Sequence, residues 1–196
     1  MFRNIMTDIL TVTAFLFFVA LFIVGLLWIL VPAAYGLPSR PTHPDRIRAA
    51  LRLAKLQADE TLYDLGCGDG RVLVIAAKEF GAIAVGIEIG PAQRLVSRAA
   101  ALYNGVRDRV RVEAGNFYTS DVSKADVVFL YATSTETGKL ASHLAGRMKP
   151  GSRVVSISAD FPTWEPTLVD EERLIFLYAM PPAAGSWITY QLKKTG

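Results

Sequence analysis

Cysteine and histidine are scarce in this chain of 196 residues, which holds one cysteine, Cys67, and two histidines. A single cysteine cannot form a disulfide within the chain, and no group of His and Cys residues has the spacing of metal ligands. The sequence therefore predicts neither a disulfide framework nor a metal site. The composition, 52% hydrophobic with a net charge of +3, indicates one folded domain and an additional apolar segment.

Charge is absent from Ile9 to Val31, where Thr11 and Thr13 are the only hydroxyl side chains. This length matches the roughly 20 residues that a helix needs to cross a bilayer. The main alternative is a cleaved secretory signal, but its apolar core is usually shorter, about 7–15 residues. We therefore expect residues 1–31 to form an N-terminal transmembrane helix.

Basic residues lie mainly on the C-terminal side of this segment. Arg3 precedes it and is offset by Asp8, whereas five basic residues follow it: Arg40, Arg46, Arg48, Arg52 and Lys55. The positive-inside rule then predicts a single-pass membrane protein whose C-terminal domain is cytoplasmic. Attraction of these residues to anionic lipid explains the pI near 9.1, so the expected partner is a lipid bilayer and no nucleic acid is expected.

Proline is concentrated between Pro32 and Pro44, where the segment holds four prolines and a glycine. Such a segment is not expected to be helical, so residues 32–44 are predicted to be a linker and residues 45–196 the folded domain. A helix should begin at about Pro44, with Thr42 or His43 near its cap.

Past Thr61, runs rich in Val and Ile alternate with helical patterns, which predicts an α/β fold with a parallel sheet and helices on both faces. The runs Arg173–Ala179 and Trp187–Leu192 flank a Pro-rich turn and predict a closing antiparallel hairpin. Two prolines make the connection 159–172 too broken for a helix. The other expected strands are 61–65, 83–88, 109–114, 126–131 and 152–158, and the expected helices are 71–79, 91–104 and 135–148.

The first of these strands runs into three glycines spaced two apart, Gly66, Gly68 and Gly70. Without side chains the backbone there can take left-handed angles and lie against a ligand. The dinucleotide pattern Gly-x-Gly-x-x-Gly does not fit because the third glycine falls one residue early, and a Walker loop is excluded because no Gly-Lys-Ser/Thr follows. Glu88 ends the next strand, where a carboxylate can bind both ribose hydroxyls. A simple tight turn is the alternative interpretation.

The pattern Asp64-x-Gly66-x-Gly68-x-Gly70 resembles that of class I S-adenosylmethionine (SAM) methyltransferases. The resemblance implies a Rossmann-like, seven-stranded sheet with an antiparallel last strand, and SAM as the cofactor. SAM carries an ammonium and a sulfonium but no phosphate, which suits an acid beside the loop. The resemblance also implies an adenine contact at Asn116 and Phe117, where a simple Gly-Asn turn is the alternative. The predicted cofactor-binding residues are Thr42, Asp64, Gly66, Cys67, Gly68, Gly70, Glu88, Asn116 and Phe117.

The fourth strand ends at Tyr131, where methyltransferases of nucleobase amines carry Asn/Asp-Pro-Pro-Tyr, and this signature is missing. A neutral alkyl amine attacks well on its own, so the protein mainly has to remove water, lower the lysine pKa and align the atoms. Tyr131 is the predicted catalytic residue, as a hydrogen-bonding group or wall of the amine channel. Simple packing is the alternative role.

Further segments resemble the small protein lysine methyltransferases: Pro41-Thr42-x-Pro44, Phe129-Leu130-Tyr131, Pro150–Ser156 and Asp160-Phe161-Pro162-x-Trp164. That family includes membrane-anchored mitochondrial enzymes acting on the ATP synthase c-subunit and the adenine nucleotide translocase, and an archaeal relative. The resemblance implies a membrane-anchored methyltransferase acting on lysines of a membrane-associated protein, at the mitochondrial inner membrane if the source is eukaryotic. A lipid or quinone-type substrate and a non-catalytic SAM-binding membrane module are the alternatives.

Overall fold

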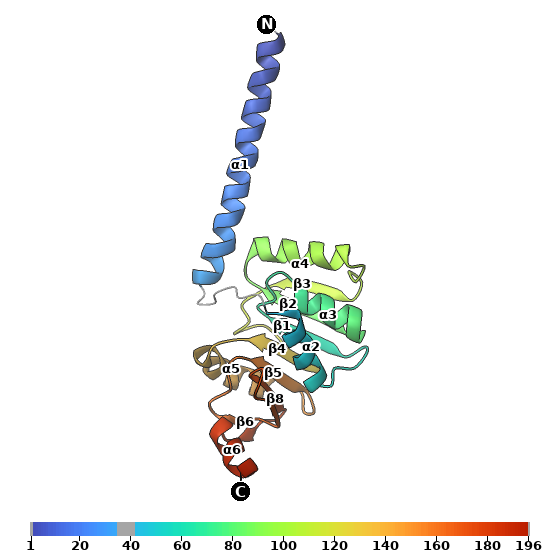
Figure 1. The fold of residues 1–196 in the computed structure, drawn as a ribbon, viewed down its shortest axis with the longest axis vertical. Helices are drawn as coiled ribbons and strands as arrows, with labels where there is room; N and C mark the ends of the chain where they lie inside the picture. The colour runs from blue at the N-terminus through green and yellow to red at the C-terminus, as the bar shows by residue number, and fades with distance from the viewer. Residues whose placement is uncertain (1, 35–41, 196) are drawn as a thin grey trace. The chain divides into compact units, whose positions relative to one another are not determined.

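A computed structural model describes residues 2–34 and 42–195 of the chain, and Figure 1 shows its ribbon. The chain divides into two compact units, residues 1–39 and 40–196. Residues 35–41, which include Arg40 and Pro41 and most of the predicted linker, lie outside the described residues.

The first unit holds one helix, α1 (Phe2–Ala34). By length and composition, the 20 residues from Asp8 to Leu27 could cross a membrane, and their side chains are exposed. Inside this stretch the Thr13 hydroxyl donates to the Ile9 carbonyl (2.8 Å), so the helix itself satisfies it. The predicted linker start at Pro32 is wrong, because α1 continues to Ala34. A proline removes one helical hydrogen bond, but its φ is compatible with a helix.

A seven-stranded sheet forms the centre of the second unit. Its strands are β1 (Thr61–Leu65), β2 (Ile83–Glu88), β3 (Val110–Ala114), β4 (Val127–Tyr131), β5 (Arg153–Ile157), β7 (Leu168–Asp170) and β8 (Ile175–Ala179). They lie in the order β3-β2-β1-β4-β5-β8-β7. The first five are parallel, and β8 is antiparallel to both of its neighbours. The predicted α/β fold with an antiparallel last strand is confirmed.

Four helices connect these strands or precede them: α2 (Pro44–Leu53), α3 (Arg71–Phe80), α4 (Pro91–Tyr103) and α5 (Ser134–Arg147). α2 packs on α3, and α3 packs on α4 (Figure 1). In the sheet, β2 and β3 lie on one side of β1, whereas β4 and β5 lie on the other side. Right-handed crossovers therefore place α5 on the face opposite α3 and α4. As expected, α2 begins beside His43, whose side chain accepts a hydrogen bond from the Asp45 amide.

An aromatic cluster follows β5, in the segment that was expected to hold no helix. There the chain forms β6 (Trp164–Glu165), which pairs with β9 (Ala183–Ala184). The rings of Phe161 and Trp164 stack at 4.1 Å, and both contact the ring of Tyr178 on β8. The Tyr178 hydroxyl also accepts a hydrogen bond from the Phe161 amide (2.9 Å). These buried rings fix the segment that a helix would otherwise occupy.

The predicted strand at Trp187–Leu192 is wrong, because these residues lie in a helix, α6 (Trp187–Thr195). The hairpin partner of β8 is instead β7, which precedes it. Ser186 and Thr189 exchange hydrogen bonds at the start of α6: the Ser186 amide donates to Thr189 Oγ1 (2.6 Å) and the Thr189 amide to Ser186 Oγ (3.4 Å). This reciprocal capping starts the helix. The alternation of polar and apolar residues in Trp187–Leu192 had indicated a strand instead.

The hydroxyl of Tyr178 gives a first prediction. Tyr178→Phe should leave the buried Phe161 amide without its acceptor and lower the free energy of unfolding by about 1–3 kcal/mol. The measurement is the urea midpoint of the full chain in detergent. Tyr103→Phe is the control, because Tyr103 is 91% exposed and its replacement should leave the midpoint unchanged. Equal midpoints for the two variants would contradict the prediction.

Candidate active site

The glycine loop lies at the carboxyl end of β1, between that strand and α3. All three of its glycines have positive φ, +87° at Gly66, +53° at Gly68 and +80° at Gly70. The amides of Gly66 and Cys67 both donate to the Ile87 carbonyl (2.9 and 3.2 Å), which ties the loop to the end of β2. The loop therefore has the strand-to-helix setting that a cofactor loop requires.

Ser97 of α4 is hydrogen-bonded to this loop, and the sequence analysis did not identify this residue. Its hydroxyl donates to the Gly68 carbonyl (2.9 Å) and lies 3.7 Å from the Cys67 sulfur. A Cβ at Gly70 would lie 2.7 Å from the Ser97 hydroxyl oxygen, so the glycine is needed for space as well as for its φ. Ser97 lies on the buried side of the helix, four residues after buried Gln93.

Glu88 stands at the end of β2 with both carboxylate oxygens engaged. One oxygen accepts a hydrogen bond from the Gly68 amide (3.0 Å) and the other from the Gly90 amide (2.7 Å). A carboxylate has about four acceptor positions, so roughly two are left for hydroxyl donors such as those of a ribose. The fixed orientation of this buried side chain suits the predicted role.

Asp64, near the end of β1, is a buried carboxyl with an unfavourable charge environment. Burial raises the pKa of Asp64 well above its ordinary value, and the nearby carboxylates of Glu88 and Asp69 raise it further. Asp69 is itself paired with Arg71 (2.5 Å). A ligand ammonium beside Asp64 would supply the missing positive charge, so the residue fits a cationic cofactor.

Cys67 points into the core beneath the loop. Burial, followed by the charge of Asp64, raises the pKa of the Cys67 thiol far above its ordinary value. A Cβ at Gly86 would lie 2.5 Å from its sulfur, which shows how closely β2 packs on it. The thiol is therefore a neutral packing group, and the backbone of Cys67 is hydrogen-bonded to the Ile87 carbonyl and the Gly70 amide.

At the end of β3, Asn116 and Phe117 begin a turn. The Asn116 side-chain oxygen accepts a hydrogen bond from the Tyr118 amide (3.0 Å), and its carbonyl accepts one from the Ser120 amide (3.0 Å). Gly115 and Asn116 thus form a turn, which the alternative interpretation predicted. The side-chain oxygen of Asn116 still has one acceptor position left for a ligand. Phe117 is buried, with its ring 4.3 Å from that of Tyr118.

Tyr131 ends β4 at the same level as the glycine loop and Glu88. Leu65 pairs with Leu130 on one side and with Ile87 on the other, so Gly66, Tyr131 and Glu88 are the next residues on three adjacent strands. Two strand spacings, about 10 Å, therefore separate the backbones of Glu88 and Tyr131. Tyr131 is partly exposed, as a residue that meets a substrate must be.

Arg46 of α2 lies over Tyr131, and the sequence analysis gave it no role in the site. Its guanidinium carbon is 6.0 Å from the centre of the tyrosine ring. One guanidinium nitrogen donates to the Ser158 hydroxyl (3.1 Å) and to the Arg173 carbonyl (2.6 Å), which fixes the side chain across the ends of β4 and β5. The sequence analysis counted Arg46 only among the basic residues that set the membrane orientation, and that count did not separate it from its solvent-facing neighbours.

Thr42 reaches the same edge of the sheet through its backbone. Its carbonyl accepts a hydrogen bond from Arg71 (3.0 Å), which also bonds Asp69 in the glycine loop. Thr42 is buried. The segment before α2 is thus fastened to the loop, and the structure brings Thr42, Asp64, the three glycines and Glu88 to one edge of the sheet.

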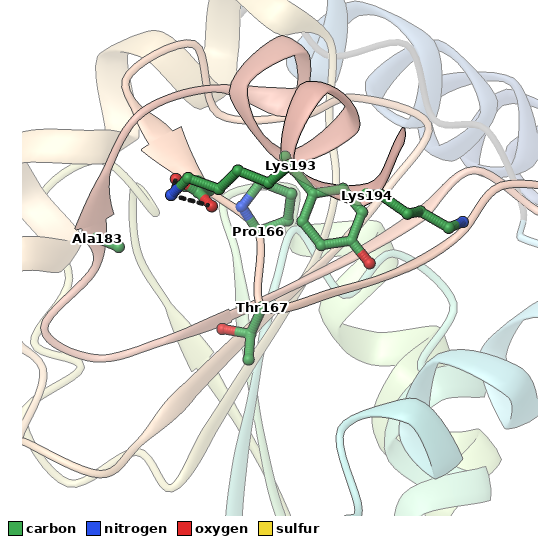
Figure 2. A pocket seen from close by; sticks show the side chains of 7 residues that line it. Pro166, Thr167, Ala183, Lys193 and Lys194 are labelled. Atoms are coloured by element: carbon green, nitrogen blue, oxygen red, sulfur yellow. Dashed lines mark hydrogen bonds and ion pairs between the residues drawn. The ribbon is translucent and has the colours of Figure 1, made fainter. Parts of the chain in front are cut away.

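A separate pocket of about 400 Å³ lies near α6, at the opposite end of the sheet from β3. Figure 2 shows it, with the ion pair between Lys193 and Glu165 (2.8 Å). Lys194 is also paired, with Glu171 (2.9 Å). Both lysines are thus neutralised, and the pocket contains no predicted site residue. It is lined by Glu165, Pro166, Thr167, Ala183, Tyr190, Lys193 and Lys194.

Comparison with known proteins decides the family. The family model of the ANTKMT methyltransferase domain matches residues 64–168 of the chain. The chain belongs to this family. The match begins at Asp64 and includes the glycine loop, Glu88 and Tyr131. The chain is accordingly a SAM-dependent methyltransferase, as its motifs predicted.

Several relatives of this methyltransferase have known activities or structures. The protein-lysine N-methyltransferase of Saccharolobus islandicus is 38% identical over 130 residues, 66% of this chain and 81% of that protein. The lysine N-methyltransferase of the ATP synthase c-subunit from Xenopus laevis is 28% identical over 66% of this chain, which spans only 57% of that protein. An RNA methyltransferase from Salinibacter ruber, crystallised with S-adenosyl-L-homocysteine, is 36% identical, covers 74% of this chain and 97% of its own, and superposes with a TM-score of 0.71.

The contact between Gly70 and Ser97 gives a second prediction. Gly70→Ala should strain a backbone at φ +80° and push Ser97 from the loop, which lowers the free energy of unfolding by about 2–6 kcal/mol. Gly146→Ala is the matched control, because Gly146 lies inside α5 with nothing within 4 Å of an added Cβ. That change should stabilise the methyltransferase by about 1 kcal/mol. Urea unfolding of both variants measures the difference, and a loss of the same size in both would contradict it.

The raised pKa of Asp64 gives a third prediction. Only the ionised carboxyl can pair with an ammonium, so the affinity for SAM should rise with pH through the raised pKa of Asp64. Asp64→Asn should abolish this dependence and weaken binding about 10–100-fold at high pH, with the two proteins converging at low pH. Calorimetric titration with SAM over a pH series is the measurement. A parallel pH dependence in the variant would contradict the assignment.

The same carboxyl should act in the opposite direction on the stability of the free protein. Because the native group keeps its proton to higher pH than the unfolded one, stability falls as pH rises from the ordinary Asp value, about 3.9, to the raised native pKa of Asp64. Asp64→Asn should therefore raise the melting temperature above this window while it weakens SAM binding. A variant that merely misfolds would lower both.

Proposed function

We propose that this methyltransferase transfers methyl groups to lysine side chains of a membrane-associated protein. The observation that carries the proposal is the strand edge at Tyr131, where a partly exposed tyrosine stands level with Glu88 and the glycine loop. No Asn/Asp-Pro-Pro-Tyr signature for a planar nitrogen is present there. The identity to an archaeal protein-lysine N-methyltransferase supports an amine as acceptor.

The cofactor would be held by residues from three elements. Bound SAM supplies an electrophilic methyl group on its sulfonium. The free acceptor positions of Glu88 suit the ribose hydroxyls, and the uncompensated carboxyl of Asp64 suits the ammonium. The turn at Asn116 and Phe117 follows β3, the strand beside β2, and its free acceptor position and buried ring would suit the adenine.

Tyr131 and Arg46 would act on the acceptor amine. A lysine must release its proton to solvent before it can react, and a nearby positive charge lowers the amine pKa and so favours this release. The guanidinium of Arg46, fixed 6.0 Å from the Tyr131 ring, provides such a charge. The Tyr131 hydroxyl can then hold the neutral nitrogen while the ring excludes water from the approach.

Helix α1 would anchor the enzyme in a bilayer, with residues 1–34 as the anchor and the domain from Pro44 onward on the cytoplasmic side. The 20 exposed and largely apolar residues Asp8–Leu27 support a membrane span. The excess of basic residues after the helix supports the orientation. An anchored enzyme meets membrane proteins at a raised effective concentration, which compensates for a small domain.

Transfer of labelled methyl from SAM to membrane extract tests this function and is the fourth prediction. The full chain, reconstituted in vesicles, should label a protein band, and mass spectrometry should place the methyl on lysine. Label in extracted lipid or in RNA would overturn the proposal. A lipid product would select the quinone or lipid alternative, and an RNA product would match the relative from Salinibacter ruber.

Two variants separate the proposed roles. Tyr131→Phe should lower kcat about tenfold or more with unchanged affinity for SAM, because only the amine loses a hydrogen bond. Glu88→Ala should weaken SAM binding about 10–100-fold, because it removes the ribose acceptor and frees the loop. Ser142→Ala, at an exposed position of α5, should change neither value. An unchanged kcat in Tyr131→Phe would reduce Tyr131 to packing.

A further inference from the structure

Helix α4 carries an apolar stripe on its outer side. Leu95, Val96, Leu102 and Tyr103 are 69%, 41%, 61% and 91% exposed. They stand at positions i, i+1, i+7 and i+8 of the helix, with exposed Ala99 at i+4 between them, so all five share one side. The inner side of the same helix is buried through Gln93, Ser97 and Ala101. The helix is thus apolar on the side that no described residue covers.

The corresponding surface of α5 is different. Its exposed positions are polar or small, among them Thr135, Lys139 and Ser142. Both helices lie on the same sheet and come from the same kind of crossover. An outward apolar stripe is therefore a property of α4 and not of the fold.

The charge around the stripe is positive. Residues 91–109, which form α4 and the loop after it, hold four arginines and one acid, Asp108, and α4 itself has no acidic residue. Among these arginines, in the described part of the chain, only Arg109 has an ion-pair partner, Asp59 (2.9 Å). Arg94 donates to the carbonyls of Glu88 and Ile89 at the end of β2, and Arg98 donates to the Val112 carbonyl within β3. These bonds fix both arginines beside the stripe without neutralising them.

We propose that the outer side of α4 lies on an anionic membrane surface, with Leu95, Val96, Leu102 and Tyr103 at the boundary of head groups and acyl chains. An apolar helix side flanked by arginines is the pattern of helices that lie in this interface. The inference rests on the proposed anchoring through α1, which brings the domain to a bilayer. The inference goes beyond that proposal because it specifies which surface of the domain contacts the lipid.

The dimensions of the stripe favour lipid over a second copy of the chain. A helix of 13 residues is about 20 Å long, and a stripe about 10 Å wide offers roughly 200 Å² to a partner. A stable protein interface buries about 800 Å² on each side. A bilayer imposes no such minimum, because the transmembrane anchor already holds the domain in place.

This orientation would bring the cofactor site close to the membrane. α4 begins directly after Glu88 and Gly90, and its Ser97 holds the glycine loop. The reaction would then be restricted to lysines near the bilayer surface, while those of soluble segments far from it would be excluded.

The chain is well suited to labelling at single sites, because its one native thiol, Cys67, is buried and its raised pKa keeps it protonated. The fifth prediction uses a polarity-sensitive fluorophore at Leu95→Cys or Leu102→Cys in the full chain, reconstituted one copy per nanodisc with phosphatidylcholine and phosphatidylglycerol. Lys139→Cys on α5 is the matched control, and Leu16→Cys in α1 reports the anchor. Spin-labelled lipids quench the fluorophores according to depth, and retained SAM binding verifies the fold.

Quenching at positions 95 and 102 should be at least about threefold stronger than at position 139, and strongest for spin labels near the head groups. Quenching equal to that at position 139, or a change that needs two copies per disc or an added protein, would overturn the inference. An unquenched label at position 16 would overturn the anchoring and this inference together. A quenched label at position 16 with unquenched 95 and 102 would overturn this inference alone.

Discussion

Two hydrogen bonds to the carboxylate of Glu88 determine the geometry of the whole site. One comes from Gly68 in the loop before α3, and the other comes from Gly90 in the turn before α4. A single side chain at the end of β2 thus fixes the starting points of two helices. The glycine loop needs such a fixed point, because a backbone with three positive φ values has little preference for one conformation. In the proposed function the same carboxylate would also accept the ribose hydroxyls, so one group would serve both structure and binding.

The charge distribution of the site suits a positively charged ligand. Asp64, Asp69 and Glu88 gather around the loop, and Arg71 neutralises only Asp69. The free protein therefore carries an unfavourable concentration of negative charge, which a cationic ligand relieves. Functional sites often retain such locally unfavourable arrangements, because their relief on binding contributes to selectivity. At the other end of the strand edge, Arg46 introduces the opposite charge near Tyr131. The strand edge thus carries negative charge around the glycine loop and positive charge near Tyr131.

Much of the fold followed from local patterns in the sequence. The first five strands were predicted within one residue of their observed bounds, because runs of Val and Ile between turn residues mark buried parallel strands. The glycine loop and Glu88 were found because their spacing is local. Ser97 and Arg46 were missed because their partners are distant: Gly68 lies 29 residues from Ser97, and Ser158 lies 112 residues from Arg46. α6 was mistaken for a strand because a short amphipathic segment fits either period, and only its capping residues and its packing decide.

Ser97 and the outer stripe of α4 belong to one rigid helix. A helix moves as a unit, so a contact that favours one position of α4 from outside also favours one conformation of the glycine loop inside, through the bond between Ser97 and Gly68. Thermodynamic linkage makes this effect reciprocal, since a ligand that fixes the loop favours the same position of the helix. If the outer side of α4 lies on a membrane as proposed, that contact would also help to hold the glycine loop in one conformation. The hydrogen bond between Ser97 and Gly68 would thus connect the outer side of α4 with the glycine loop.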